Sequence, residues 1–210
     1  MKIALFGATG GTGKNVLKRA LAAGHEVIVF ARKPDTVAVT HERLRVERGD
    51  VLDSASFSGK LAGVDAVIST VGPPSNFTPG TLISQGANNL VTGCMSAGVK
   101  RFVHESGIIA SDGAELSGGS RFALSLLRML VGKLYQEKIA AEATIRASAL
   151  EWVIVRPPVL DHSAATGSYQ AGVGARISPI KALSHDDVAE FLVKAATEPQ
   201  WARQIVNVGH

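Results

Sequence analysis

The stretch KIALFGATGGTG, residues 2–13, joins a short apolar run to glycines spaced Gly7-x-x-Gly10-x-x-Gly13. The apolar run predicts a buried strand, and residues 11–23 have the spacing of an amphipathic helix. In such a unit the first glycine allows a tight turn, the second lets the backbone approach a pyrophosphate, and the third lets the helix pack closely on the sheet. The free N–H groups at the helix start then face the phosphates. We therefore expect a dinucleotide-binding loop made by Gly7, Thr9, Gly10, Gly11, Thr12 and Gly13.

Short apolar runs alternate with helical patterns along the rest of the chain. The runs are mostly continuous, as expected for buried parallel strands. They lie at Ile3–Phe6, Glu26–Ala31, Arg43–Glu47, Ala66–Thr70, Arg101–His104, Trp152–Val155 and Gln204–Val208. The helical patterns lie at residues 11–23, 54–61, 79–97, 133–148 and, after a Ser184 N-cap, up to about Thr197. This alternation predicts an α/β fold, a Rossmann-like doubly wound parallel sheet.

Two stretches interrupt the alternation. Residues 107–132 are rich in glycine and serine and then strongly apolar, and residues 157–183 carry prolines and glycines with little helical period. Ligands of doubly wound sheets bind outside the carboxyl ends of strands, and both stretches follow predicted strands. We therefore expect one domain over residues 1–210 in which these stretches form a small C-terminal substrate lobe. Residues 122–131 are expected to form part of a pocket for a flat ring.

The residues after the second predicted strand indicate which dinucleotide is bound. Enzymes that bind NAD usually carry Asp or Glu there to hold the ribose 2′-OH, whereas this chain has Arg32 and Lys33. A guanidinium forks onto a 2′-phosphate, which a carboxylate would repel. The pair therefore favours NADP(H), the alternative being two solvated surface cations.

Residues after the third and fourth predicted strands complete the expected cofactor site. Asp50 is placed to accept a hydrogen bond from the adenine amino group while Val51 packs on the ring, although a plain turn would also suit Asp50. After the fourth strand, Val71 precedes Gly72, and a glycine at this edge of the sheet permits close approach of the cofactor.

Composition and charge exclude several classes of protein. Hydrophobic residues make up 46% of the chain and charged residues 19%, the balance of a globular protein rather than a disordered one. The net charge of +4 attracts phosphate-bearing ligands, but no Lys/Arg run exceeds a pair, so nucleic-acid binding is not expected. A Walker A loop is excluded because Lys14 is followed by Asn15 rather than by Ser or Thr.

Neither a metal site nor a membrane partner is expected. The six histidines are scattered without ligand spacing. No window has the roughly 18 consecutive apolar residues of a membrane span, and the first residues lack the apolar core of a secretory signal. We expect a cytoplasmic protein whose one cysteine, Cys94, is a buried thiol in an apolar helix.

Six motifs are spread along the chain: GATGGTG at 7–13, GDV at 49–51, RFVHES at 101–106, Lys138…Glu142, WVIVRPP at 152–158 and SHDDVA at 184–189. As a set they resemble the atypical short-chain dehydrogenase/reductase group, which includes the NmrA-like proteins and the flavin reductase/biliverdin-IXβ reductase family. The resemblance covers nearly the whole chain and implies a Rossmann fold that binds NAD(P)(H). Two departures stand out: Leu134 occupies the position of the catalytic Tyr of extended members, and Val159 that of the His after the Pro-Pro pair in the flavin and biliverdin reductases.

With those departures, the resemblance leaves two polar side chains near the nicotinamide. Ser106 either hydrogen-bonds a substrate carbonyl or the carboxamide, or caps a strand end. Lys138 either holds the nicotinamide ribose or pairs with Glu142, and Arg156 either braces the Pro-Pro loop or is exposed. The predicted catalytic residues are Ser106 and Lys138, both also cofactor contacts, and the Pro-Pro loop adds Pro157 and Pro158.

These residues predict an NADPH-dependent reductase that transfers a hydride to a flat conjugated acceptor such as a flavin or a quinone. Such acceptors need little acid/base help, which fits a site without a catalytic Tyr. The expected partner is then a small molecule, with neither nucleic acid nor a membrane involved, and the oligomeric state stays open. Two alternatives remain: an NmrA-like sensor that binds NADP(H) without turnover, and a sugar-nucleotide epimerase or dehydratase, which the chain length and the missing Tyr disfavour.

Overall fold

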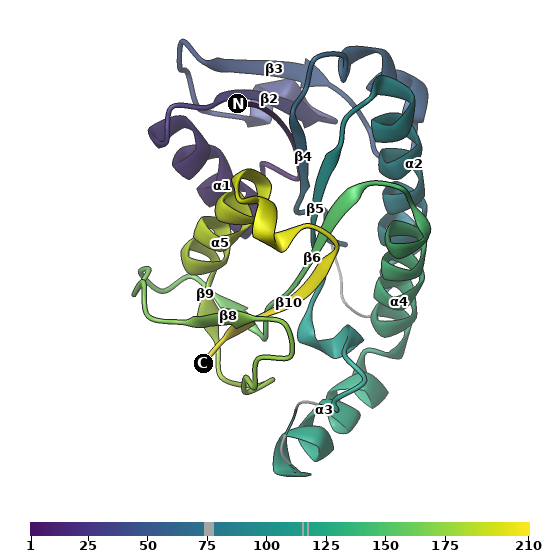
Figure 1. Cartoon of the computed structure of the whole chain (residues 1–210), viewed down its shortest axis with the longest axis vertical. Helices are drawn as coiled ribbons and strands as arrows, with labels where there is room; N and C mark the ends of the chain where they lie inside the picture. The colour runs from purple at the N-terminus through teal and green to yellow at the C-terminus, as the bar shows by residue number, and fades with distance from the viewer. Residues whose placement is uncertain (74–77, 115, 117) are drawn as a thin grey trace.

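The computed structural model describes residues 1–73, 78–114, 116 and 118–210, and a central sheet lies between layers of helices (Figure 1). The strands are β1 (Lys2–Phe6), β2 (Glu26–Ala31), β3 (Leu44–Arg48), β4 (Ala66–Ser69), β5 (Arg101–Glu105), β6 (Glu151–Arg156), β7 (Leu160–Asp161), β8 (Gln170–Gly172), β9 (Leu183–Ser184) and β10 (Gln204–Gly209). The α-helices are α1 (Gly11–Ala22), α2 (Leu82–Ala97), α3 (Gly118–Leu130), α4 (Gly132–Ala147) and α5 (His185–Thr197).

The main sheet has the order β3-β2-β1-β4-β5-β6-β10-β8. The strands from β3 to β10 are parallel, and β8 runs antiparallel to β10 at one edge. The order of the first six is that of doubly wound sheets that bind dinucleotides at the point where the chain reverses direction across the sheet. The predicted Rossmann-like fold is therefore confirmed. A separate small sheet pairs β7 with β9.

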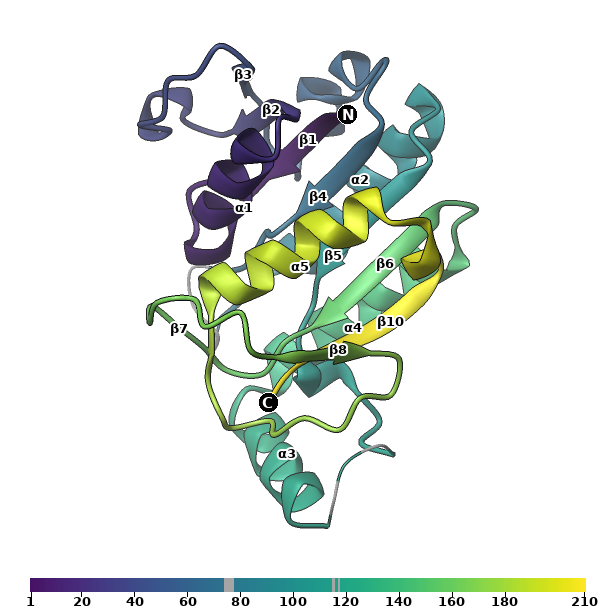
Figure 2. The same ribbon diagram turned by 60° about the vertical axis from the view of Figure 1, so that its left-hand side comes forward.

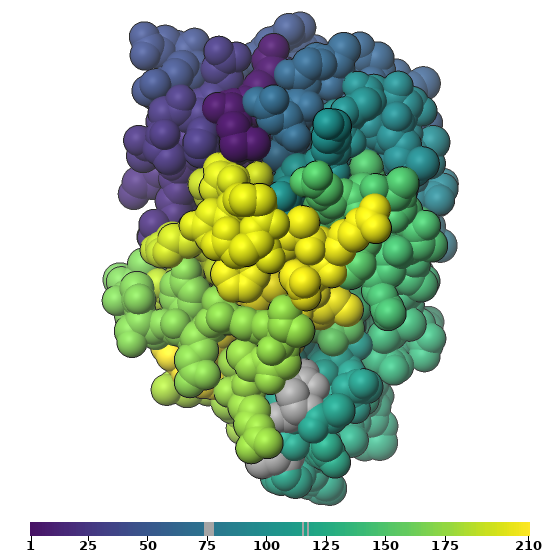
Figure 3. Space-filling view, in the orientation of Figure 1, coloured from purple at the N-terminus to yellow at the C-terminus, as the bar shows by residue number. Residues whose placement is uncertain are grey.

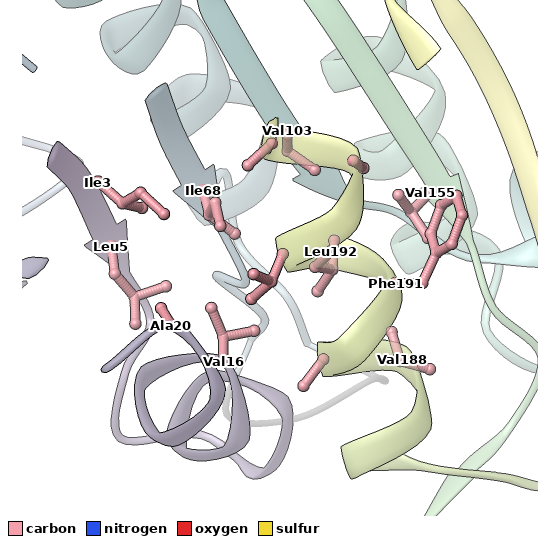
Figure 4. Packing of buried hydrophobic residues seen from close by; sticks show 14 of the residues in the cluster. Ile3, Leu5, Val16, Ala20, Ile68, Val103, Val155, Val188, Phe191 and Leu192 are labelled. Carbon is pink, nitrogen blue, oxygen red and sulfur yellow. The ribbon is translucent and has the colours of Figure 1, made fainter. Parts of the chain in front are cut away.

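Helices cover both faces of the sheet, α1 and α5 on one and α2 and α4 on the other (Figures 1 and 2). Successive residues of a strand point to opposite faces of the sheet. Because helices cover both faces, the residues of β1 that point to either face are apolar. Ile3 and Leu5 pack under α1 and α5 (Figure 4), whereas Ala4 and Phe6 pack under the other pair of helices. Cys94 lies fully buried in the second core, as predicted, and burial raises the pKa of its thiol to about 12.

The observed strands of the main sheet confirm the seven predicted ones, each to within one residue at either end. The predicted cap of the last helix is also confirmed, because the Asp187 N–H donates to Ser184 Oγ at 3.0 Å. The predicted helix at 54–61 is wrong: two single 3₁₀ turns lie there instead. Ser56 Oγ and Ser58 Oγ donate to nearby backbone carbonyls, and such local bonds compete with a continuous helix.

The two irregular stretches meet at one end of the molecule. Residues 107–132 contain α3, a helix that the sequence analysis did not predict, and it projects beyond the sheet (Figures 1 and 2). Residues 157–183 form β7, β8, β9 and long loops, which lie beside α5 in the space-filling view (Figure 3). Both stretches therefore cover the end of the sheet at which the parallel strands finish.

Candidate functional site

Two adjoining cavities form a trough along the carboxyl ends of the central strands. One has a volume of about 590 Å³ and the other about 510 Å³. Gly10, Thr70, Val71 and Gly72 line both, so the trough is continuous past the ends of β1 and β4. Open α/β sheets bind their ligands in this position, outside the carboxyl ends of the strands where the strand order reverses. The structure thus puts Val71 and Gly72 at the centre of the trough, as their position after the fourth strand predicts.

The glycine loop has the geometry that its spacing predicts. Gly7 has a φ of +89°, and a Cβ there would lie 2.6 Å from the Thr70 carbonyl oxygen. A Cβ on Gly13 would overlap the Gly7 carbonyl oxygen, so only glycine lets α1 pack this closely on β1. At Gly10 the nearest atom to a Cβ is the Gly7 oxygen at 3.4 Å, so its open side faces the trough. Gly7 therefore makes the turn, Gly13 allows the close packing of α1, and Gly10 leaves the backbone open to a ligand.

The start of α1 is prepared for an anion. Gly10 provides no side-chain cap, and the first turn carries no acidic residue. The first N–H groups of a helix have no intrahelical partner, and they carry the positive end of the helix dipole. Gly11 and Thr12, the first two helical residues, line the trough. These N–H groups are therefore available to a pyrophosphate.

The larger cavity collects the residues predicted to hold the adenosine half of the cofactor. It is lined by Thr9, Arg32, Lys33, Asp50 and Val51 together with the glycine loop. Arg32 and Lys33 are exposed, and within the described part of the chain neither forms an ion pair. Asp50 Oδ1 accepts the Leu52 N–H at 3.0 Å, so this side chain also has the turn role that we left open.

The smaller cavity brings the two irregular stretches together. Ile108, Ile109, Leu127 and Val131 come from the first, and Pro157, Pro158, Val159 and Leu160 from the second. The wall that they form is largely apolar. Only part of the predicted 122–131 wall takes part: Leu127 lies in the lining, whereas Phe122 and Met129 are about three-quarters exposed on the outer side of α3.

Ser106 and Lys138, the predicted catalytic pair, lie together in this smaller cavity. Lys138 Nζ donates to the Ser106 carbonyl oxygen at 2.5 Å, and Ser106 Oγ donates to Glu142 Oε1 at 2.6 Å. Glu142 is buried and takes two contacts from Arg156, at 3.0 Å to Oε1 and 2.5 Å to Oε2. The described residues hold no Lys138–Glu142 ion pair, and Arg156, the last residue of β6, is joined to α4 by its ion pair with Glu142 rather than being exposed.

The positions of the two missing catalytic groups are filled by apolar side chains. Leu134 is buried and lines the cavity, and Val159 lines it from the opposite stretch. Tyr135 is one residue further along α4, and the Arg128 guanidinium lies over its ring, with Cζ 4.8 Å from the centroid of the tyrosine ring. Among the described residues that line the trough there is no tyrosine.

Glu105 and His185 line the smaller cavity, and neither was predicted to be a site residue. Glu105 Oε1 accepts the Thr12 hydroxyl at 2.8 Å, and Thr12 Oγ1 lies 2.9 Å from His185 Nδ1. Burial raises the pKa of Glu105 and lowers that of the neighbouring Lys138. The position of Glu105 at the end of β5 is a signal that could have found it. His185 lies within the quoted motif at 184–189, but no local pattern predicts its contact with Thr12, which is 173 residues away in the chain.

Two further predictions concern other ligands and membranes. The described residues contain no group of three or more His, Cys, Asp or Glu side chains arranged to hold a metal ion. They also contain no helix that is both long and apolar enough to span a bilayer.

The fold and the trough define a Rossmann-type protein with a dinucleotide site. A protein-family model described as NAD(P)H-binding matches residues 7–199, and the chain therefore belongs to this NAD(P)H-binding family. The chloroplastic protein At2g34460 of Arabidopsis thaliana is 29% identical over 215 residues, 99% of this chain and 76% of the plant protein.

Solved structures share the fold over the full length of the chain. The oxidoreductase ylbE of Lactococcus lactis has a TM-score of 0.83 at 22% identity, covering 100% of this chain and 91% of that one. ChuY, an anaerobillin reductase of Escherichia coli O157:H7, has a TM-score of 0.80 at 23% identity, covering 100% and 97%. These structures show the shared fold, and the family match confirms the NAD(P)H-binding family that the resemblance implies, with a nicotinamide dinucleotide as the cofactor.

Proposed function

We propose that this protein is an NADPH-dependent reductase that transfers a hydride to a flat conjugated acceptor of the flavin or quinone type. The observation that carries the proposal is the smaller cavity: a largely apolar wall faces Ser106 and Lys138 at the end of the trough beyond the pyrophosphate site. Apolar walls with a few fixed polar groups suit a planar ring that needs orientation more than acid/base catalysis.

The preference for NADPH over NADH rests on the larger cavity. Arg32 and Lys33 line it next to the glycine loop, and neither is neutralised by a carboxylate of the described residues. A 2′-phosphate placed here gains charge-assisted hydrogen bonds, whereas a 2′-hydroxyl gains little from two cations. This proposal makes the pair the determinant of cofactor choice.

The hydrogen bonds at the nicotinamide end favour one of the roles left open for Ser106. Its hydroxyl proton is donated to Glu142, so Ser106 Oγ can only accept a hydrogen bond from a ligand. The carboxamide NH₂ of the nicotinamide is such a donor, whereas a substrate carbonyl is not. Ser106 is thus proposed to orient the carboxamide, and Lys138 to hold the ribose beside it.

The chemistry then needs no side chain that gives up a proton. When bound, NADPH would supply a hydride, two electrons with a proton, and would be released as NADP⁺. Ser106 and Lys138 would hold the nicotinamide end in place, and the reduced acceptor would take its second proton from water. A conjugated acceptor spreads the negative charge over its own ring, so holding the two rings together accounts for most of the rate gain, up to roughly 7–11 kcal/mol. The description of ChuY as an anaerobillin reductase gives a reductase precedent on this fold.

The test is steady-state oxidation of NADPH, followed at 340 nm, with FMN, FAD and a small quinone as acceptors. We expect oxidation above the uncatalysed rate with at least one of them, and slower oxidation of NADH. A protein that binds NADPH but oxidises it with none of the acceptors would overturn the reductase and leave a nucleotide sensor as the function of the site.

A further inference from the structure

We propose that His185 is a ligand of the cofactor pyrophosphate and that NADP(H) binding takes up a proton on this imidazole. The inference rests on the cofactor half of the proposed function and does not depend on the acceptor. It adds a side chain from the far end of the chain to a site otherwise built from the backbone of the glycine loop.

The position of the ring carries the first step. His185 is the first residue of α5, which packs beside α1 on the same face of the sheet (Figure 2). Its imidazole lies against Gly11, where a Cβ would come within 2.6 Å of Nε2. His185 lines the smaller cavity together with Gly10, Gly11 and Thr12. The ring therefore borders the helix start to which a pyrophosphate binds.

The hydrogen bonds fix which nitrogen faces the ligand. Thr12 gives its hydroxyl proton to Glu105, so it can only accept from His185 Nδ1, which must carry a proton. The neutral ring is then left with a bare Nε2. Protonation of Nε2 changes neither of these bonds, and it creates an N–H donor beside Gly11. The network holds the ring ready to donate to a phosphate oxygen.

The surrounding charges set the direction of the proton linkage. In the free protein, burial and the neighbouring His162, whose ring centroid is 4.8 Å away, lower the pKa of His185, while Asp161 opposes them. A pyrophosphate beside Nε2 favours the charged ring and raises this pKa. The charged or titratable groups around the ring are Asp161 at the end of β7, His162 after it and, through Thr12, Glu105 of β5. Lys138 of α4 lines the same cavity, and the neighbouring residue of α5, Asp186, is paired with Arg19 of α1.

The sign follows from these two states. Because the pKa of His185 is higher with the nucleotide bound, binding takes up a proton. Affinity is then greatest below the pKa of the free protein and falls as the pH rises towards the pKa of the complex. Within this window the dissociation constant should rise by up to about tenfold per pH unit.

Calorimetry of NADPH binding in two buffers of different ionisation enthalpy measures the proton uptake directly. We expect uptake with the wild-type protein that is lost in His185→Gln and kept in His162→Gln, a matched change in the adjacent ring. The ligand 2′-AMP, which has the 2′-phosphate without a pyrophosphate, should bind without uptake; this comparison needs no variant.

The outcomes separate the two proposals. NADPH binding without proton uptake, equal uptake in His185→Gln, or equal uptake with 2′-AMP would each overturn the role of His185 and leave the proposed reductase standing. A wild-type protein that binds no NADPH would overturn both.

Discussion

Replacing Glu142 by Gln should lower the free energy of unfolding by about 3 kcal/mol. Glu142 has 3% of its surface exposed and receives two contacts from Arg156, whose side chain is 12% exposed, and one from Ser106. The variant leaves the guanidinium without its carboxylate in a site that water barely reaches, and breaking a buried pair from one side costs about 3–5 kcal/mol. Gln keeps part of the hydrogen bonding, so the expected loss lies at the lower end of this range of about 3–5 kcal/mol.

Urea denaturation followed by circular dichroism measures this loss, and a fall in Tm of about 6–12 °C should accompany it for a chain of this size. Lys194→Ala is the matched control, because it breaks a half-exposed ion pair with Glu190 and should cost under about 1 kcal/mol. In the double variant Glu142→Gln/Arg156→Met the two losses should not add, since both remove the same pair. A loss for Glu142→Gln no larger than that of the control would refute the reasoning.

Four further changes test the trough. Arg32→Asp should reverse or abolish the preference for NADPH over NADH, and equal affinities of the wild-type protein for the two nucleotides would contradict the assignment. Gly10→Val should remove NADPH binding from a folded protein, because the valine side chain enters the trough; unchanged affinity in calorimetry would count against this. Gly13→Ala should cost about 3 kcal/mol of stability, because the new Cβ overlaps the Gly7 carbonyl; unchanged stability in denaturation would count against this. Ser106→Ala should slow turnover about tenfold, the loss of one neutral hydrogen bond, with an unchanged rate as the contrary result.

The parts of the fold that follow from local sequence could be predicted. The strand before Gly7 and the helix after it carry their own signals, apolar continuity and glycine spacing, and the seven strands of the main parallel sheet were found for the same reason. The 54–61 helix failed because apolar spacing alone does not reveal that Ser56 and Ser58 bond the nearby backbone. The helix α3 was missed because its glycine- and serine-rich start masked the amphipathic pattern that follows.

The parts of the site that depend on contacts between distant residues could not be predicted. The spacing along one helix left a pair between Lys138 and Glu142 as one of two alternatives, but Arg156 from β6 contacts both oxygens of Glu142 instead. His185 reaches Thr12 only because α5 packs beside α1, and nothing near residue 185 encodes that neighbour. Local patterns thus placed the glycine loop, Arg32, Lys33, Asp50 and Val51 in the trough, and tertiary packing added Glu105 and His185 and decided what the side chains bind.

The most direct test of the central claim is a single-turnover measurement with the wild-type protein, NADPH and a small quinone. Absorbance at 340 nm in a stopped-flow instrument follows the nicotinamide, first with NADPH and then with NADPH deuterated on the transferring side of C4. We expect oxidation faster than the uncatalysed reaction and slower with deuterium, because the bond from C4 to the transferred hydrogen breaks as the hydride passes to the acceptor. Bound NADPH that is oxidised no faster than in buffer would contradict it.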